Sequence, residues 1–138
     1  MLTIADPVSK LRYLIDTGAE ISVLPPSAED RRNPSVGMQL QAANGSSIRT
    51  FGDRSVQVDL GLAKAFTWTF TIAEVTKPII GADFLRYFGL LVDVGRKRLM
   101  DAETFLTVPA SYRRSAVSKL CVLVQADRYA DNWMNSTR

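Results

Sequence analysis

The stretch LIDTGAEISVLP, residues 14–25, decides how this chain is interpreted. Apolar residues precede and follow the triplet Asp16-Thr17-Gly18, so a carboxylate is presented on a tight turn between two strand-like segments. The triplet occurs once in the 138 residues. A mechanism that uses two facing carboxylates would therefore need two copies of the chain, with half of the site in each.

Composition removes many other kinds of chemistry. The chain has no histidine, which excludes Ser-His and Cys-His nucleophiles, imidazole acid–base catalysis and histidine-ligated metal sites. Its one cysteine, Cys121, can form neither an intrachain disulfide nor a cysteine-cluster zinc site. Carboxylates and hydroxyls remain as the chemical groups, and we expect neither a metal nor another cofactor.

The charge pattern is typical of a soluble domain. The net charge is +3, and the basic residues fall in short groups that we interpret as solvated turns rather than as a nucleic-acid surface. No apolar run approaches the roughly 18 residues of a membrane span, and residues 1–6 do not resemble a secretion signal. We therefore expect an intracellular, cytoplasmic protein with neither a nucleic-acid nor a membrane partner.

Short apolar runs separated by Gly, Pro, Asn and Asp predict a single all-β domain. Alternation predicts strands around Val56 to Leu60 and Phe66 to Ile72, and the second of these carries an aromatic row that we expect to dominate the core. Asn44-Gly45 predicts a hairpin. Within residues 82–89, Phe84, Leu85 and Phe88 repeat at helical spacing before Gly89 and predict one short helix, whereas residues 27–37 are predicted as a loop. Further predicted strands are 2–5, 11–15, 90–94 and 99–100.

The pattern weakens after Thr104. We therefore predict a folded domain over residues 1–104, followed by a C-terminal tail or linker over residues 105–138. Within this tail, Leu120 to Val124 is the one apolar run.

Three segments, in order, resemble retroviral-type (retropepsin-like) aspartic proteases, particularly those in the polyproteins of gypsy-like LTR retrotransposons. Residues 14–25 resemble the active-site loop of that family, residues 42–46 (AANGS) resemble its flap, and residues 79–85 (IIGADFL) resemble its apolar-apolar-Gly segment with the short helix that follows. Retroviral members often carry an arginine directly after that glycine. Ala82 stands there in this chain, as in the retrotransposon branch.

The resemblance implies a retropepsin-like acid protease fold that is active as a C2 homodimer. It implies peptide hydrolysis by a water activated between two Asp16 carboxylates, with Thr17 bonding across the two-fold axis and Gly18 completing the catalytic triplet. The substrate would be a polypeptide, namely a site in a retrotransposon polyprotein, and residues 105–138 would lead toward a following polyprotein domain. The residues implied in substrate binding are Ala19, Ala43, Asn44, Gly45 and Ser46.

Two other interpretations stay open at this point. One is a catalytically silent peptide-binding or dimerisation module, domesticated or remnant, that keeps the fold without turnover. The other is an unrelated β domain in which Asp16-Thr17-Gly18 is an ordinary surface turn. The intact triplet favours the enzyme over the silent module.

Overall fold

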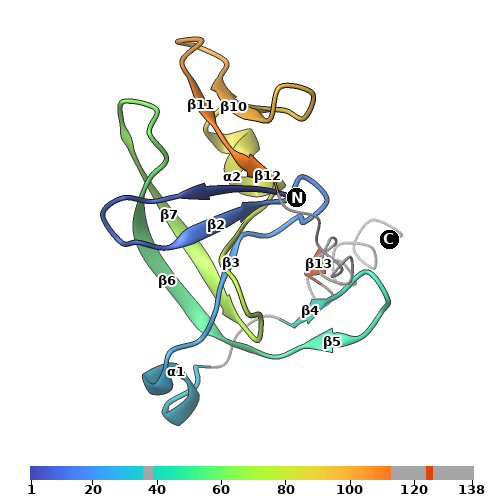
Figure 1. Ribbon diagram of the computed structural model, residues 1–138. Helices are drawn as coiled ribbons and strands as arrows, with labels where there is room; N and C mark the ends of the chain where they lie inside the picture. Colours follow the sequence, from blue (N-terminus) through green and yellow to red (C-terminus); the bar gives the residue numbers. More distant parts are fainter. Residues whose placement is uncertain (36–38, 113–123, 126–138) are drawn as a thin grey trace, which may run out of the picture.

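The computed structural model describes residues 1–35, 39–112 and 124–125, and these are mostly β-structure (Figure 1). In spatial order, the seven-stranded sheet contains β12 (Ser111–Tyr112), β1 (Leu2–Ala5), β2 (Arg12–Ile15), β8 (Ile79–Ile80), β3 (Val23–Leu24), β7 (Ala65–Ala73) and β6 (Thr50–Asp59). The two three-stranded sheets are β11 (Thr107–Pro109), β10 (Arg98–Asp101), β9 (Leu90–Asp93), and β13 (Val124–Gln125), β4 (Leu40–Gln41), β5 (Ser47–Ile48). The helices are α1 (Ala28–Arg32) and α2 (Ala82–Tyr87). The predicted all-β class is confirmed.

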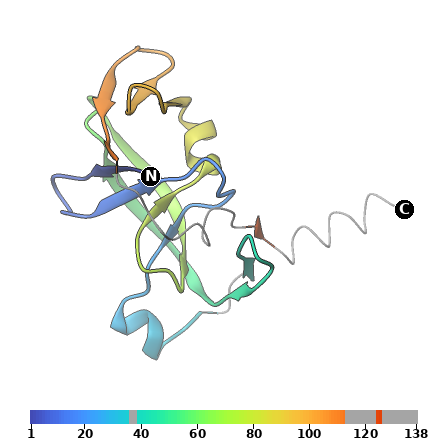
Figure 2. The ribbon, with the colours of Figure 1, turned by 45° about the vertical axis from the view of Figure 1, so that its right-hand side comes forward.

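The long β6–β7 hairpin organises the molecule. Its antiparallel register pairs Val56 with Trp68 and Val58 with Phe66, so the two predicted alternating runs face each other. The small sheet β9–β11 lies at the turn end of this hairpin, where an ion pair of 3.3 Å joins Lys64 Nζ to the buried Asp101 carboxylate. The β4–β5 hairpin leads into β6 at the other end (Figures 1 and 2).

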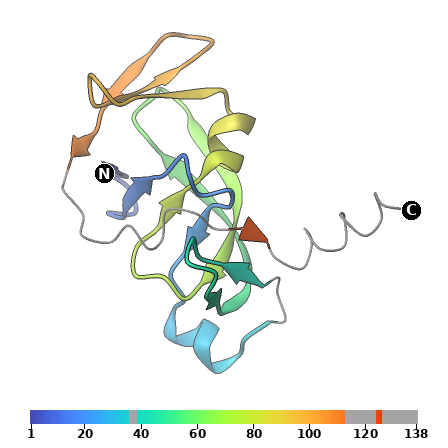
Figure 3. The same ribbon diagram turned by 90° about the vertical axis from the view of Figure 1, so that its right-hand side faces the viewer.

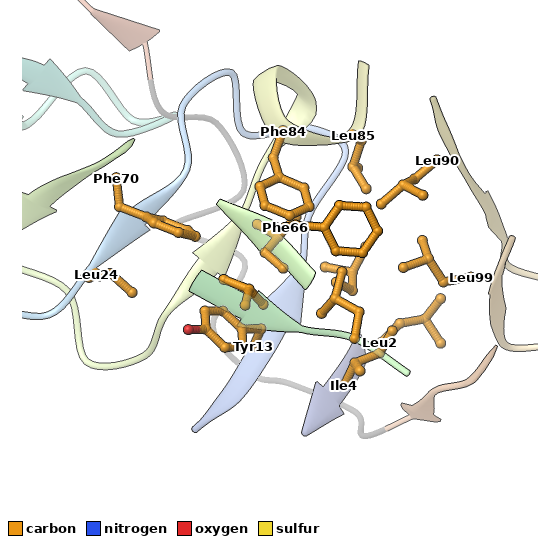
Figure 4. Close-up of a cluster of buried hydrophobic side chains, with 14 of the residues drawn as sticks. Leu2, Ile4, Tyr13, Leu24, Phe66, Phe70, Phe84, Leu85, Leu90 and Leu99 are labelled. Carbon is orange, nitrogen blue, oxygen red and sulfur yellow. The ribbon is translucent and has the colours of Figure 1, made fainter. Parts of the chain in front are cut away.

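The predicted aromatic row forms the centre of the core (Figure 4). Phe66 and Phe70 of β7 are buried and meet Phe84 of α2, with ring centroids 5.7 and 6.2 Å apart. Trp68 packs against the same cluster from a half-buried position, with Tyr87 5.1 Å away. Because α2 covers this row, the helix is fixed to the sheet next to the strand β8 that precedes it.

The predicted helix before Gly89 is confirmed as α2. Gly89 adopts a φ of +62°, the left-handed conformation that ends a helix and that glycine tolerates best. The predicted hairpin at Asn44-Gly45 is also confirmed, with Leu40 opposite Ile48 and Gly45 at a φ of +84°.

A second short helix, α1, lies where the sequence predicted a loop. Its five residues bury nothing, so no apolar periodicity marks it. A capping box holds it instead: the Ser27 hydroxyl accepts from the Asp30 amide, and the Asp30 carboxylate accepts from the Ser27 amide. The amide of Ser27 and the guanidinium of Arg54 lower the pKa of Asp30 to about 2. The pattern Ser27-x-x-Asp30 was the available signal.

Three of the described strands follow the predicted boundary at residue 104, and the first two are β11 and β12. β11 pairs with β10 and β12 pairs with β1, placing Leu99 opposite Val108 and Leu2 opposite Tyr112. Both strands are too short and too exposed to give an alternating pattern. The role of residues 105–138 as a linker stays a prediction, and residues 113–123 and 126–138 lie outside the described residues.

Asp6 joins the turn after β1 to the end of β6. Its side chain is 1% exposed; Oδ1 accepts from the amides of Val8 (2.8 Å) and Ser9 (3.2 Å), and Oδ2 accepts from the amide of Asp59 (3.0 Å). Burial opposes ionisation of Asp6, but these amides outweigh it and lower its pKa. The ionised carboxylate therefore stabilises the fold.

We expect Asp6→Asn to destabilise the protein by about 1–3 kcal/mol at neutral pH, because asparagine has one accepting oxygen in place of two and carries no charge. A lowered folded-state pKa gives a contribution that is present above the unfolded pKa and is lost as the pH falls through the folded pKa. Urea unfolding over a pH series should show the variant and the native protein converging in acid. A difference that does not change with pH would contradict this assignment, and Asp53→Asn on the exposed side of β6 is the matched control.

No helix in the part of the chain that the structure describes is long and apolar enough to cross a membrane.

Candidate active site

Asp16 lies directly after β2, on a turn held by the strand β8. β2 runs parallel to β8, with Ile15 opposite Ile80, and the Asp16 amide donates to the Ile80 carbonyl oxygen at 3.0 Å. The Ala19 amide then donates to the Asp16 carbonyl oxygen at 3.2 Å, which closes the turn. The position of the carboxylate is therefore set by backbone hydrogen bonds on both sides of it.

The two carboxylate oxygens of Asp16 differ in their surroundings. The side chain is 7% exposed; Oδ1 accepts from the Gly18 amide at 3.0 Å, whereas buried Oδ2 has no hydrogen-bond partner among the described residues. Burial raises the pKa of Asp16, although the Gly18 and Ala19 amides act in the opposite direction. The group is thus biased toward holding a proton, as an acid–base residue requires.

The residues after Asp16 divide between exposed and buried. Thr17 and Gly18 are exposed on the surface of the turn, and Ala19 is fully buried. The Ala19 carbonyl oxygen accepts from the Ala82 amide at 2.7 Å, so the end of the turn is bonded to the start of α2. The triplet therefore presents one buried acid beneath two accessible residues.

A partly buried polar network links the strand after this turn to α2, and sequence reasoning missed it. The Ser22 hydroxyl donates to the Asp83 carboxylate at 2.6 Å and accepts from the Gly81 amide at 2.8 Å. The Asp83 carboxylate also accepts from the amides of Ser22 (3.2 Å) and Phe84 (2.8 Å). Ala82, directly after Gly81, has no polar side chain, and the acid one residue later makes this connection.

Gly81 allows the close approach on which this network depends. A Cβ at this position would lie 2.6 Å from the Ala19 carbonyl oxygen and 3.0 Å from the Ile21 carbonyl carbon. Both are backbone atoms, so no side chain could rotate away. The glycine is required by steric contact with the active-site turn.

Ser22→Ala is expected to destabilise the protein by about 2–3 kcal/mol, because it leaves the buried Gly81 amide unsatisfied and removes one donor from the half-buried Asp83 carboxylate. Thermal and urea unfolding measure this loss. Ser55→Ala, on exposed β6, is the matched control and should change stability by less than about 0.5 kcal/mol. Equal stability of the two variants would mean that the network contributes nothing.

The predicted flap residues form the connection between β4 and β5. Ala43, Asn44, Gly45 and Ser46 are all exposed. Asn44 Oδ1 accepts from the Ser46 amide at 3.0 Å and from its hydroxyl at 2.6 Å, so the tip is ordered by its own side chain.

The base of this hairpin and the active-site turn meet in one apolar cluster. Leu40 and Ile48, which are opposite each other in the hairpin, are buried together with Ala19 and Ile79. The structure thus brings the hairpin and the Asp16 turn to the same side of the molecule, with the tip residues 43–46 left exposed. In the described residues, no group of three Asp, Glu or Cys side chains could hold a metal ion.

No protein-family model matches the chain, and the comparison with curated proteins found no match. Among solved structures, the chain is similar to the retroviral protease-like domain of Ddi1 from Leishmania major, with 21% sequence identity and a TM-score of 0.60 over 81% of this chain and 94% of that one. It is also similar to the EIAV protease in complex with the inhibitor HBY-793, with 25% identity and a TM-score of 0.44 over 64% and 86% of the two chains. The first of these likenesses, together with the topology above, shows that the chain has the retropepsin-like fold.

Proposed function

We propose that the protein is an aspartic endopeptidase that acts as a C2 homodimer on extended polypeptides. The observation that carries this proposal is the buried Asp16 carboxylate, which has one oxygen held by the Gly18 amide and the other unpartnered, beneath the exposed residues Thr17 and Gly18. A second copy placed over the exposed turn would bring its own Asp16 to the first. Two such carboxylates in contact cannot both ionise cheaply, so the pair would share one proton.

The reaction proposed is hydrolysis of a peptide bond without a covalent intermediate. The ionised Asp16 takes a proton from water as that water attacks the carbonyl carbon, and the protonated Asp16 of the other subunit donates to the carbonyl oxygen. Proton return to the nitrogen then releases the amine. Burial already raises the pKa of Asp16 within one chain, which favours the shared-proton state.

The substrate proposed is a peptide in extended conformation, placed between the β4–β5 hairpin and the Asp16 turn, with residues 43–46 contacting it. Ala19, predicted as a further contact, is fully buried and supports the turn from the core side instead. A peptide in this place would pair its main chain with the hairpin and alternate its side chains toward the apolar cluster and away from it. Processing of a retrotransposon polyprotein is the biological role that we propose, supported by the motifs at residues 14–25, 42–46 and 79–85.

The proposal is tested by measuring cleavage of a diverse quenched-peptide library over a series of protein concentrations, from acidic to neutral pH. Because each chain supplies one Asp16, activity per chain should rise with concentration and saturate when the dimer is fully formed. A statine-type inhibitor should stop cleavage and a chelator should not. The dimeric mechanism would be refuted if activity per chain did not depend on concentration while ultracentrifugation showed the protein to be a monomer.

A catalytically silent peptide-binding or dimerisation module is the second candidate. The observation that favours it is the pairing of β13 with β4, which fills one edge of the flap hairpin. The same experiment separates the two: a dimer that binds the inhibitor but cleaves no peptide would support the silent module.

A further inference from the structure

The edge of the flap hairpin is occupied by the C-terminal part of the same chain. β13 pairs with β4 in antiparallel orientation, with Val124 opposite Gln41 and Gln125 opposite Leu40. β5 pairs with the other edge of β4, so β4 is the central strand of its small sheet. Residues more than 80 positions apart in sequence are therefore joined through main-chain hydrogen bonding.

The position of β13 is the one in which an extended peptide substrate is expected. All three ribbon views place β13 between the turn that follows β2 and the β4–β5 hairpin (Figures 1, 2 and 3). The outer edge of β4 is where a peptide can add as a strand, since its main-chain groups are the ones that β5 leaves free. One edge cannot pair with two strands at the same level, so β13 and such a peptide exclude each other.

The chemistry of the segment also suits a peptide site. The side chain of Leu40 is buried in the apolar cluster that contains Ala19, so the core beneath this edge of β4 is apolar. The sequence from Leu120 to Ala126 carries no charge, and it includes the apolar run of the tail. An uncharged, largely apolar sequence is the kind of chain that this edge would accept.

We infer that β13 is an internal competitor, which occupies the substrate-pairing edge of β4 in its own chain and lowers the affinity of the site for peptides. This inference rests on the proposed function, because that function identifies the edge of β4 as a substrate site. The contact between β13 and β4 does not depend on the proposed function. The apparent affinity for an external peptide is the intrinsic affinity multiplied by the fraction of molecules in which the edge is free. Loss of the β13 contact should thus strengthen peptide binding and leave the chemical step unchanged.

The contact can be measured without any catalysis. A nitroxide on Cys121, the only cysteine in the chain, lies three residues before Val124 in the sequence. In the full chain carrying Asp16→Asn, it should broaden the amide NMR signals of Leu40, Gln41, Ser47 and Ile48. A label at Glu103→Cys in a Cys121→Ser background, in the β10–β11 connection, should leave those four signals sharp.

Two results of this measurement would overturn the inference. The first is sharp signals at all four positions with the label on Cys121. The second is broadening that arises only between molecules, which is detected by mixing a spin-labelled chain without isotope with an isotope-labelled chain without the nitroxide. In that case the strand on β4 comes from another copy.

The competition is tested with Val124→Pro/Gln125→Pro in the full chain, because proline cannot donate to the ladder. The KM for a cleaved peptide and the dissociation constant of a statine-type inhibitor should each fall about tenfold, while kcat stays within about twofold. The matched control is the double proline Asp131→Pro/Asn132→Pro, which should change neither. Unchanged KM and inhibitor affinity, with the amide broadening present, would show that β13 pairs with β4 without competing.

Failure of this inference and failure of the proposed function give different results. If no peptide is cleaved under any condition, the endopeptidase proposal fails, and inhibitor or peptide affinity together with the amide broadening still tests the competitor. If peptides are cleaved but the double proline changes nothing, only the competitor is lost.

Discussion

Asp16→Asn is expected to lower kcat/KM for peptide cleavage by a factor of about 10³ or more, because the pair then has no carboxylate that can ionise. The fold should survive. Burial raises the pKa of Asp16, so its contribution to stability is present below the unfolded pKa and is lost as the pH rises through the folded pKa. The side-chain amide introduced by Asp16→Asn does not ionise, so it does not lose this stability as the pH rises. The variant should therefore be at least as stable as the native protein at neutral pH. Kinetics and urea unfolding on the same samples check both statements.

Mixing the variant with the native chain gives a sharper test. If each active site combines one Asp16 from each subunit, exchange with excess Asp16→Asn chain should suppress the native activity, since mixed dimers hold one ionisable carboxylate. Asp53→Asn makes the same chemical change on the exposed side of β6 and should suppress nothing. Native activity that is indifferent to excess variant would contradict a shared site.

Gly81→Ala is expected to lower the free energy of unfolding by about 3 kcal/mol or more and to abolish peptide cleavage. The added Cβ would lie 2.6 Å from the Ala19 carbonyl oxygen, and both that oxygen and the neighbouring Ile21 backbone belong to the segment that follows Asp16. Relief requires moving either α2 or the active-site turn. Thermal unfolding and peptide cleavage measure the two consequences.

Gly95→Ala is the matched control for this substitution. Its Cβ would meet only the Asp93 Oδ1 atom, at an ordinary 3.7 Å. The free energy of unfolding of Gly95→Ala should therefore lie within about 0.5 kcal/mol of that of the native protein. If Gly81→Ala were as stable and as active as this control, the close approach between the turn and α2 would not be a constraint.

Much of the fold follows from the sequence because its signals are local. The alternation at Phe66, Trp68 and Phe70 indicates a strand with one buried face, and Asn44-Gly45 specifies a hairpin turn almost by itself. Gly89 ends α2 because of its own φ. Each of these features depends on residues that are close together in the sequence.

The features that the sequence did not predict are those without a local pattern. α1 buries no residue and depends on a cap, and its Arg31 forms a 2.7 Å ion pair with Glu74, which is distant in sequence. The link between Ser22 and Asp83 spans 61 positions and joins two residue types that are common on any surface. Strands β11, β12 and β13 are two or three residues long, so pairing with a remote strand defines them more than their own composition does.

The connection between the Asp16 turn and α2 also determines when the acid turn can become structured during protein synthesis. Residues 14–22 are synthesised before Gly81 and Asp83, which complete their hydrogen bonding and follow about sixty codons later. Until then the nascent chain has no fixed geometry around its acid, since contacts of such high sequence separation close late. Protein synthesis itself therefore delays maturation of the acid turn until residues 81–83 have emerged.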